Sequence, residues 1–301
     1  MNDLPAAVRD RLGRVGVWSN APAFAPVGHV REGLEAVEEL GFRAVWFPES
    51  VPGRESFTTA ALMLAWSERL AVCTGIMNVY ARDPAAAMNG ARALADAHPG
   101  RFVLGLGVSH APSVAQRGHD YGKPVPTMRA YLDAMEQAPY RAPEPLEPVP
   151  VLLAALGPLM LRLAAERTAG AHPYFSPVEH TAFARERLGP EPFLAPEVAV
   201  VPVRDRSEAR RAAQGHLDTY LALENYTRNL RRFGFSDDDL AGGGSDRLLD
   251  ALVAWGDAGA IRGRVREHLD AGADHVSIQL LPPGDFHVAE LRRLAPALLE
   301  L

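Results

Sequence analysis

The chain of 301 residues has little cysteine and lysine and no long apolar run. Cys73 is its only cysteine, so an intrachain disulfide is excluded and a reducing compartment suits the chain. Because Cys73 ends the apolar run 70–73, a buried strand thiol is a better interpretation than a nucleophile. No 18-residue apolar run exists and residues 1–4 lack a signal-peptide pattern, so we expect a cytoplasmic protein without membrane contact.

Positive charge is also in short supply. The 31 Lys and Arg residues are outnumbered by 37 Asp and Glu residues, which gives a net charge of −6 and a pI near 5.9. A chain with this net charge lacks the excess of positive charge that is typical of proteins that bind nucleic acid. The ten histidines are scattered without metal-ligand spacing, so we expect no metal site. No nucleophile elbow and no P-loop occurs either.

What the chain does contain is a regular alternation of apolar strand-like segments with segments of helical spacing. Eight such strands over about 300 residues predict one domain, 1–301, with the fold of a (β/α)8 TIM barrel that closes by pairing its first strand with its last. A doubly wound open sheet is the alternative. The expected strands are 15–18, 44–47, 70–74, 102–104, 149–155, 171–175, 198–203 and 275–280. We also expect one long helix over 207–230, a loop over 236–244 and a helix over 246–255.

Either fold gathers the carboxyl ends of its strands at one edge, where ligands bind. The strongest candidate wall follows the fourth strand, where Gly105-Leu106-Gly107 permits close backbone approach and His110 supplies a titratable group. His110 is a candidate general acid or base, or else an ordinary loop histidine. Glu49, after the second strand, is a candidate for orienting a ring or carrying a proton, or else a cap of the next helix.

Other strand ends supply candidate cofactor contacts. Gly157-Pro158 at a helix start is a plausible anion site because free backbone amides point outward there, although an ordinary turn explains it equally well. Gly105-Leu106-Gly107 alone is not a dinucleotide fingerprint. The full set of expected cofactor contacts is Thr74, Gly75, Ile76, Asn78, Gly107, Ser109, Ala155, Leu156, Gly157 and Tyr174.

Six short motifs in order give the chain a family likeness. They are A-V-W-F-P-E-S (44–50), C-T-G-I (73–76), R-D-P (82–84), P-G-R-F-V-L-G-L-G (99–107), V-P-V-L-L-A-A-L-G-P (149–158) and A-G-A-D-H-V (271–276). Through them the chain resembles the luciferase-like monooxygenase superfamily, and more closely its branch of oxidoreductases that use the deazaflavin coenzyme F420. The resemblance covers nearly the whole barrel.

The resemblance implies a bacterial luciferase-like barrel with F420 bound across its mouth. The ring would lie near the first four strands and the phosphate-bearing tail near Gly157. Family members often hold a non-prolyl cis peptide after the third strand, which falls at Gly75-Ile76 here. Glu49 occupies the family's acidic position after the second strand.

The chain also departs from this pattern. Glucose-6-phosphate dehydrogenases of the family have His where this chain has Ser50 and Glu where it has His110, and they place a lysine after strand six, where 177–179 offers none. We therefore do not expect a sugar phosphate as substrate. His110 becomes the candidate for proton transfer.

Three functions stay open on these grounds. The first is an oxidoreductase that moves a hydride between F420 and a small organic substrate, shaped by the loops 50–57, 111–127 and 237–245. The second is an FMN-dependent monooxygenase that uses reduced flavin and O2. The third is a flavin- or deazaflavin-binding protein without catalysis. The resemblance also implies a homodimer, and a partner reductase would supply reduced flavin or F420.

Overall fold

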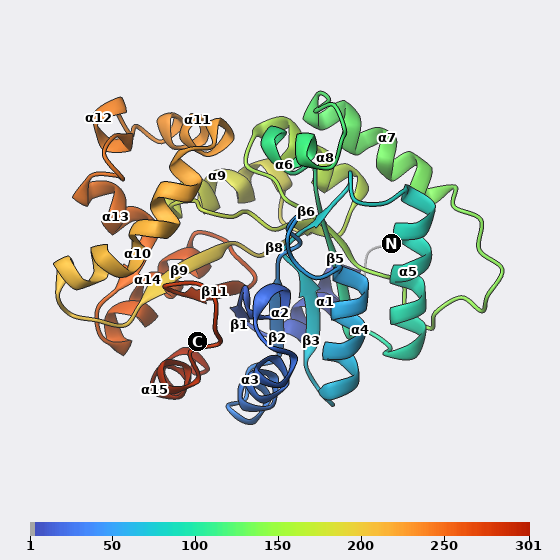
Figure 1. The fold of residues 1–301 in the computed structure, drawn as a ribbon, viewed down its shortest axis with the longest axis horizontal. Coiled ribbons are helices and arrows are strands. Elements are labelled where there is room, and N and C mark those ends of the chain that lie inside the picture. The colour runs from blue at the N-terminus through green and yellow to red at the C-terminus, as the bar shows by residue number, and fades with distance from the viewer. Residues whose placement is uncertain (1–3) are drawn as a thin grey trace.

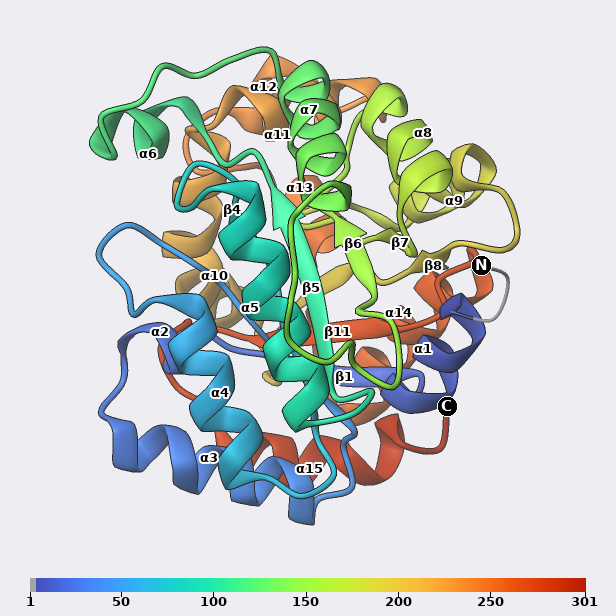
Figure 2. The same cartoon turned by 90° about the vertical axis from the view of Figure 1, so that its right-hand side faces the viewer.

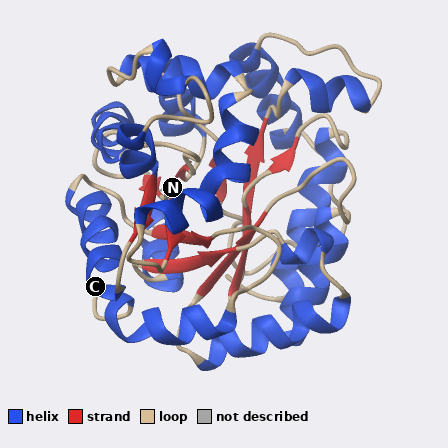
Figure 3. Ribbon diagram, turned by 60° about the vertical axis from the view of Figure 1, so that its left-hand side comes forward, coloured by secondary structure: helices blue, strands red, loops and turns tan. Residues whose placement is uncertain are grey.

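A parallel sheet curls into a barrel at the centre of the computed structural model, which describes residues 4–301 (Figure 1). Helices surround the strands on the outside (Figure 3). The strands are β1 (Val15–Trp18), β2 (Ala44–Phe47), β3 (Ala71–Thr74), β4 (Met77–Asn78), β5 (Phe102–Gly107), β6 (Val151–Leu153), β7 (Gly170–Ala171), β8 (Phe193–Leu194), β9 (Glu197–Val201), β10 (Val253–Trp255) and β11 (Val276–Leu280).

The helices occupy most of the intervening chain. They are α1 (Leu4–Leu12), α2 (Ala21–Phe24), α3 (Val27–Glu39), α4 (Ser56–Trp66), α5 (Pro84–Ala97), α6 (Ala111–Gln116), α7 (Pro124–Glu136), α8 (Pro158–Arg167), α9 (Val178–Leu188), α10 (Arg206–Leu221), α11 (Glu224–Arg232), α12 (Asp237–Leu240), α13 (Asp246–Leu252), α14 (Ala258–Asp270) and α15 (Val288–Leu298). In Figure 2, α3, α4 and α5 lie against the outside of the first strands. Among residues 4–301, no helix combines the length and the apolar character needed to cross a bilayer.

The predicted barrel is confirmed, including the pairing of its first and last strands. Strand β1 pairs in parallel with both β2 and β11, and the remaining order is β2-β3-β5-β6-β7-β8. The barrel closes through residues 193–201. Phe193 there donates its backbone N–H to Ala169 O at 2.8 Å on the β7 side, and Leu194 O accepts from Asp274 N at 2.9 Å on the β11 side. All pairs in this sheet are parallel, so every carboxyl end meets at one mouth.

One expected helix is wrong at its end. The residues Val253–Trp255 were expected to finish the helix 246–255 but form β10, which pairs in parallel with β9. Val253 already has an extended backbone, with φ −119° and ψ 121°. Pairing with a strand edge that would otherwise lack partners outweighs the weak helical preference of this short apolar segment.

Two other expected elements are also corrected. The helix over 207–230 is broken into α10 and α11, because Leu223 takes an extended conformation between them and caps α11. The break turns the chain so that Tyr226 packs against Tyr220, with ring centroids 5.2 Å apart. The expected loop 236–244 contains α12, whose start is fixed by a capping box between Ser236 and Asp239.

Two apolar layers hold the barrel together. Val45, Val72 and Leu104 lie in the layer between strands and helices, while the alternate residues Trp46 and Cys73 point inward. Helix α1 joins the inner layer through Val8 and Leu12. Because this helix lies against Gly100 and Pro150, just before β5 and β6, it covers the amino ends of the strands. The opposite end of the barrel carries the candidate site.

Candidate functional site

The barrel mouth is built around an interruption between β3 and β4. Both short strands pair with β5, and between them the Gly75-Ile76 peptide bond is cis. Gly75 donates its N–H to Phe47 O at 2.7 Å, so the interruption is held to β2 as well. The expected non-prolyl cis peptide is therefore confirmed at the expected position.

Two glycines of β5 allow the interruption to lie close. A Cβ atom on Gly105 would collide with the backbone oxygen of Thr74, and one on Gly107 would lie 2.5 Å from Ile76 Cδ1. The Thr74 hydroxyl group replaces part of the missing strand pairing, since Oγ1 accepts from Gly105 N at 2.8 Å and donates to Gly105 O at 2.9 Å. Thr74, Gly75, Ile76 and Gly107 are thus brought together as predicted from the sequence.

Beneath this interruption lie two buried nitrogen atoms without a protein partner, Trp18 Nε1 and His172 Nε2. A Cβ atom on Gly75 would lie 2.6 Å from the first and 3.0 Å from the second. His172 Nδ1 lies 2.6 Å from Ala195 O, which fixes the proton on Nδ1 and leaves Nε2 as a lone-pair acceptor. Burial lowers the pKa of His172 to about 4, so the ring is neutral at neutral pH.

Glu49 holds the interruption in place from the end of β2. Its Oε2 atom accepts from Asn78 N at 2.8 Å, and its carboxylate forms an ion pair with Arg82. The Glu49 side chain is 3% exposed and that of Arg82 is 12% exposed. Helix α4 is capped by Glu55 instead, which accepts from Phe57 N and Thr58 N. Glu49 is therefore not the helix cap considered above, and a proton-transfer role for it stays a prediction.

Ser109 and His110 lie where β5 leaves the barrel. Ser109 has a left-handed backbone with φ 59°, which turns the chain into α6, and His110 occupies the N-cap position without a capping side-chain bond. The His110 ring lies 5.5 Å from that of Tyr226. Burial lowers the pKa of His110, and the Asn225 side chain partly opposes this shift. A half-buried neutral imidazole at the mouth suits a general base.

The remaining expected cofactor contacts differ in burial and in the hydrogen bonds that they already make. Ala155 is buried in the layer between strands and helices, with 2% of its surface exposed. Leu156 O accepts from His180 Nε2 at 3.0 Å. Gly157 precedes α8 without a capping side chain and with open space where a Cβ atom would stand. The Tyr174 hydroxyl group is engaged, since it donates to Gln279 Oε1 at 2.6 Å.

One buried acid inside the barrel was missed by the sequence reasoning. Glu197, at the start of β9, is 2% exposed, and burial raises its pKa to about 8. Its Oε2 atom accepts from Phe175 N at 3.2 Å, while Oε1 has no protein partner. The one available signal was a lone acidic residue heading the apolar run Val198–Val201, a place where burial makes ionisation costly.

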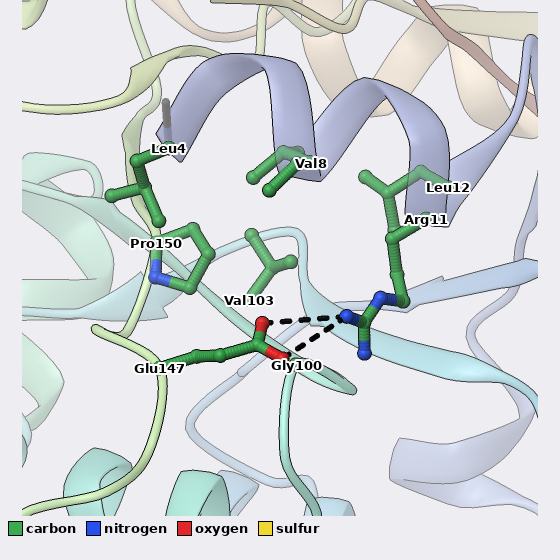
Figure 4. A pocket seen from close by; sticks show the side chains of 9 residues that line it. Leu4, Val8, Arg11, Leu12, Gly100, Val103, Glu147 and Pro150 are labelled. Carbon is green, nitrogen blue, oxygen red and sulfur yellow. Dashed lines mark hydrogen bonds and ion pairs between the residues drawn. The ribbon is translucent and has the colours of Figure 1, made fainter. Parts of the chain in front are cut away.

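A shallow pocket at the other end of the barrel is unrelated to this mouth (Figure 4). It lies between α1 and the loops before β5 and β6, where Arg11 pairs with Glu147. Among residues 4–301, no three His, Cys, Asp or Glu side chains are grouped to hold a metal ion.

Comparison with known proteins decides the family. A family model described as luciferase-like monooxygenase matches residues 11–275, which includes all strands of the barrel except β11. The chain belongs to the luciferase-like monooxygenase family. The match places the Gly75-Ile76 interruption, Glu49 and His110 within the shared region of this enzyme family.

Curated relatives of this luciferase-like enzyme include two proteins named for F420 or methanopterin chemistry. A putative coenzyme F420-dependent oxidoreductase of Mycobacterium tuberculosis is 29% identical over 194 residues, which cover 54% of each chain. The chain thus spans about half the length of that relative. A 5,10-methylenetetrahydromethanopterin reductase of Methanolobus tindarius is 23% identical, with 83% of this chain and 90% of the relative covered.

Solved structures share the fold at low identity. An F420-dependent secondary alcohol dehydrogenase, solved with an F420-acetone adduct, has a TM-score of 0.74 at 14% identity, covering 95% of this chain and 98% of the other. The oxygenating component of 3,6-diketocamphane monooxygenase from Pseudomonas putida, solved with FMN, has a TM-score of 0.67 at 13% identity, covering 95% of both chains. The fold therefore serves both coenzyme types.

Proposed function

We propose that this luciferase-like enzyme transfers a hydride between coenzyme F420 and a small organic substrate. The observation that supports this most is the Gly75-Ile76 interruption beside Gly107, placed where the family resemblance puts the deazaflavin ring. The name of the mycobacterial relative supports F420 over FMN. A reductase that supplies reduced coenzyme and a homodimeric assembly are further parts of this proposal.

The residues at the mouth fit such a coenzyme. Gly107 leaves its Cβ position to the Ile76 side chain, so backbone and one aliphatic side chain lie together at the place proposed for the ring. Trp18 Nε1 and His172 Nε2 beneath it lack protein partners. Free amides at the start of α8, next to the open space at Gly157, suit a phosphate-bearing tail.

The coenzyme, when bound, supplies the hydride chemistry, and this chain's residues orient the reactants and move the proton. His110 is the proposed proton-transfer group because it is half-buried at the end of β5 and its lowered pKa keeps it neutral at neutral pH. Glu49 is proposed to act mainly as a positioning residue, since its carboxylate is bound to Arg82 and Asn78 N.

An FMN-dependent monooxygenase is the second candidate, favoured by the fold likeness to the FMN-bound camphane enzyme. Coenzyme titration of the purified protein distinguishes the two. We expect F420 to bind tightly, with quenching of its fluorescence, and FMN to bind at least tenfold more weakly. Tight FMN binding with no F420 binding would contradict the proposal. Binding without hydride transfer to any of a panel of alcohols and ketones would favour a protein that binds the coenzyme but does not catalyse.

A further inference from the structure

Several aromatic side chains surround Glu197 beside the barrel mouth. We name Tyr174, Phe175, His216, Tyr220 and Tyr226 the aromatic cluster. The ring centroids of Tyr174 and Tyr220 lie 5.0 Å apart, and those of Phe175 and Tyr226 lie 5.5 Å apart. The cluster joins the end of β7 to α10 and α11, which pack on the same side of the barrel (Figure 1).

Glu197 points from the strand toward the inside of the barrel. Phe193 and Ala195, at alternate positions of the same stretch, belong to the inner layer, so Glu197 continues this inward-facing series one step nearer the mouth. Its register partner Ser277 on β11 is fully buried. Tyr174 then links the acid to the mouth, since its ring lies 5.3 Å from that of Trp18, beneath Gly75.

Polar atoms without protein partners gather in this region. Glu197 Oε1 and His216 Nε2 are both buried and unpartnered, in side chains that are 2% and 3% exposed. A buried polar group that makes no hydrogen bond is costly, so proteins rarely keep one without a further partner. The aromatic rings around them offer apolar contact area to the same partner.

We propose that Glu197 and the aromatic cluster form the substrate subsite, in which Glu197 donates a hydrogen bond from Oε1 to the oxygen atom of a small, uncharged carbonyl compound. This proposal rests on the proposed function and names its substrate class. An anionic substrate is disfavoured, since no cationic side chain among residues 4–301 forms a bond or ion pair with Glu197 or the cluster.

The protonation states in the cluster make this role specific to Glu197. Burial lowers the pKa of His216 to about 3 and raises that of Tyr220 to about 12. It also raises the pKa values of Tyr174 and Tyr226 well above their usual range. Between pH 6.5 and 9, therefore, the group that changes charge in the subsite is Glu197, while Gln279 and Ser277 from β11 are neutral throughout.

The test uses acetophenone, a ketone that can only accept hydrogen bonds, and benzoate, an anion of similar size. Binding to the coenzyme-free full chain is measured by calorimetry. We expect acetophenone and not benzoate to bind, and acetophenone binding to weaken about tenfold from pH 7 to pH 9, because a donor with pKa near 8 is then about one-tenth protonated.

Two variants make the test decisive. Glu197→Gln keeps an N–H donor, so we expect ketone affinity within about threefold of wild type and no pH dependence over this range. Glu197→Leu removes the donor, so we expect at least a tenfold loss at pH 7, with an unchanged circular dichroism spectrum. Glu224→Gln, on the exposed side of α11, is the control and should bind as wild type does.

Three outcomes would overturn the proposal: no ketone binding, equal ketone binding by Glu197→Leu, or an unchanged pH dependence in Glu197→Gln. F420 titration of the same variants is scored separately. If F420 binds with wild-type affinity while ketone binding is unaffected by either variant, the subsite is wrong and the proposed function stands. If F420 fails to bind wild type, the proposed function fails instead.

Discussion

At the scale of single residues, His110 and Glu49 show how similar positions take different roles. Both follow barrel strands and both carry titratable groups. Glu49 is bound on two sides by Asn78 N and Arg82, whereas His110 has no capping bond and faces the Tyr226 ring. A carboxylate held in an ion pair can position its neighbours, whereas a half-buried imidazole that forms no ion pair can exchange a proton.

His110 should therefore control the acid side of the activity profile. The pKa of His110 lies below the usual value of 6.5. As the pH falls below this lowered pKa, the imidazole becomes protonated and can no longer accept a proton, so alcohol oxidation declines. We expect His110→Ala to lower kcat by about 10²- to 10⁴-fold and to remove the acid limb of the kcat profile. Steady-state kinetics from pH 5 to 8 measure both effects.

The control is His119→Ala, an exposed histidine after α6, which should retain the profile. Unchanged turnover of His110→Ala at every pH would exclude His110 as the proton-transfer group.

At the scale of elements, the mouth depends on how β2, β3, β4 and β5 are joined. Strands β3 and β4 both pair with β5, and Glu49 ties the end of β2 to the N–H of Asn78 in β4. Arg82, just before α5, binds the other side of the same carboxylate. Both side chains of this ion pair are nearly buried, so removing one charge leaves the other without solvent to stabilise it, which costs more than it does for a surface pair.

Removing one charge from this pair should destabilise the protein. We expect Glu49→Gln to lower the free energy of unfolding by about 3 kcal/mol, because Arg82 loses its buried charged partner and keeps the half-exposed Glu55. Urea unfolding followed by circular dichroism measures this loss. Glu35→Gln, which breaks the exposed Arg31 pair of α3, should cost less than about 1 kcal/mol. Equal losses in the two variants would show that the Glu49 pair contributes no more than a surface pair.

At the scale of the whole molecule, burial of neutral histidines couples stability to pH. Burial lowers the pKa of His172, His180 and His275 to about 4 and that of His216 and His268 to about 3. The unfolded chain takes up these protons near pH 6.5 and the folded chain does not, so the unfolded state is favoured as pH falls from 6.5 toward 4. Glu197 acts in the opposite direction, since its raised pKa costs stability as pH rises from 4.5 to 8.

The five histidines together change the stability with pH more than the single acid does. We therefore expect the free energy of unfolding to fall steeply below pH 6.5, by about 1.4 kcal/mol per pH unit for each histidine. Urea midpoints from pH 4.5 to 8 measure the slope. His216→Phe should reduce this slope by about 1.4 kcal/mol per pH unit, the contribution of one proton. His29→Gln, at an exposed position, should leave the slope unchanged. A flat profile between pH 6.5 and 4.5 would contradict this account.

Much of the molecule could be predicted from the sequence by itself. Apolar strand segments such as 44–47 and 102–104, alternating with helical spacing, determine a parallel barrel because only buried strands tolerate such continuous apolar runs. That barrel determines in turn that Thr74, Gly107 and His110 share one mouth. The position of the cis peptide followed from the family likeness of residues 73–76.

Only the tertiary structure decided the rest. The strand at Val253–Trp255 exists because β9 offers an edge, which no local pattern shows. Glu49 is bound by Arg82 from 33 positions away, so its sequence position could not distinguish a positioning residue from a proton carrier. The pKa of Glu197 is raised only because the folded chain buries this acid, and burial by distant residues is not a property of any one segment.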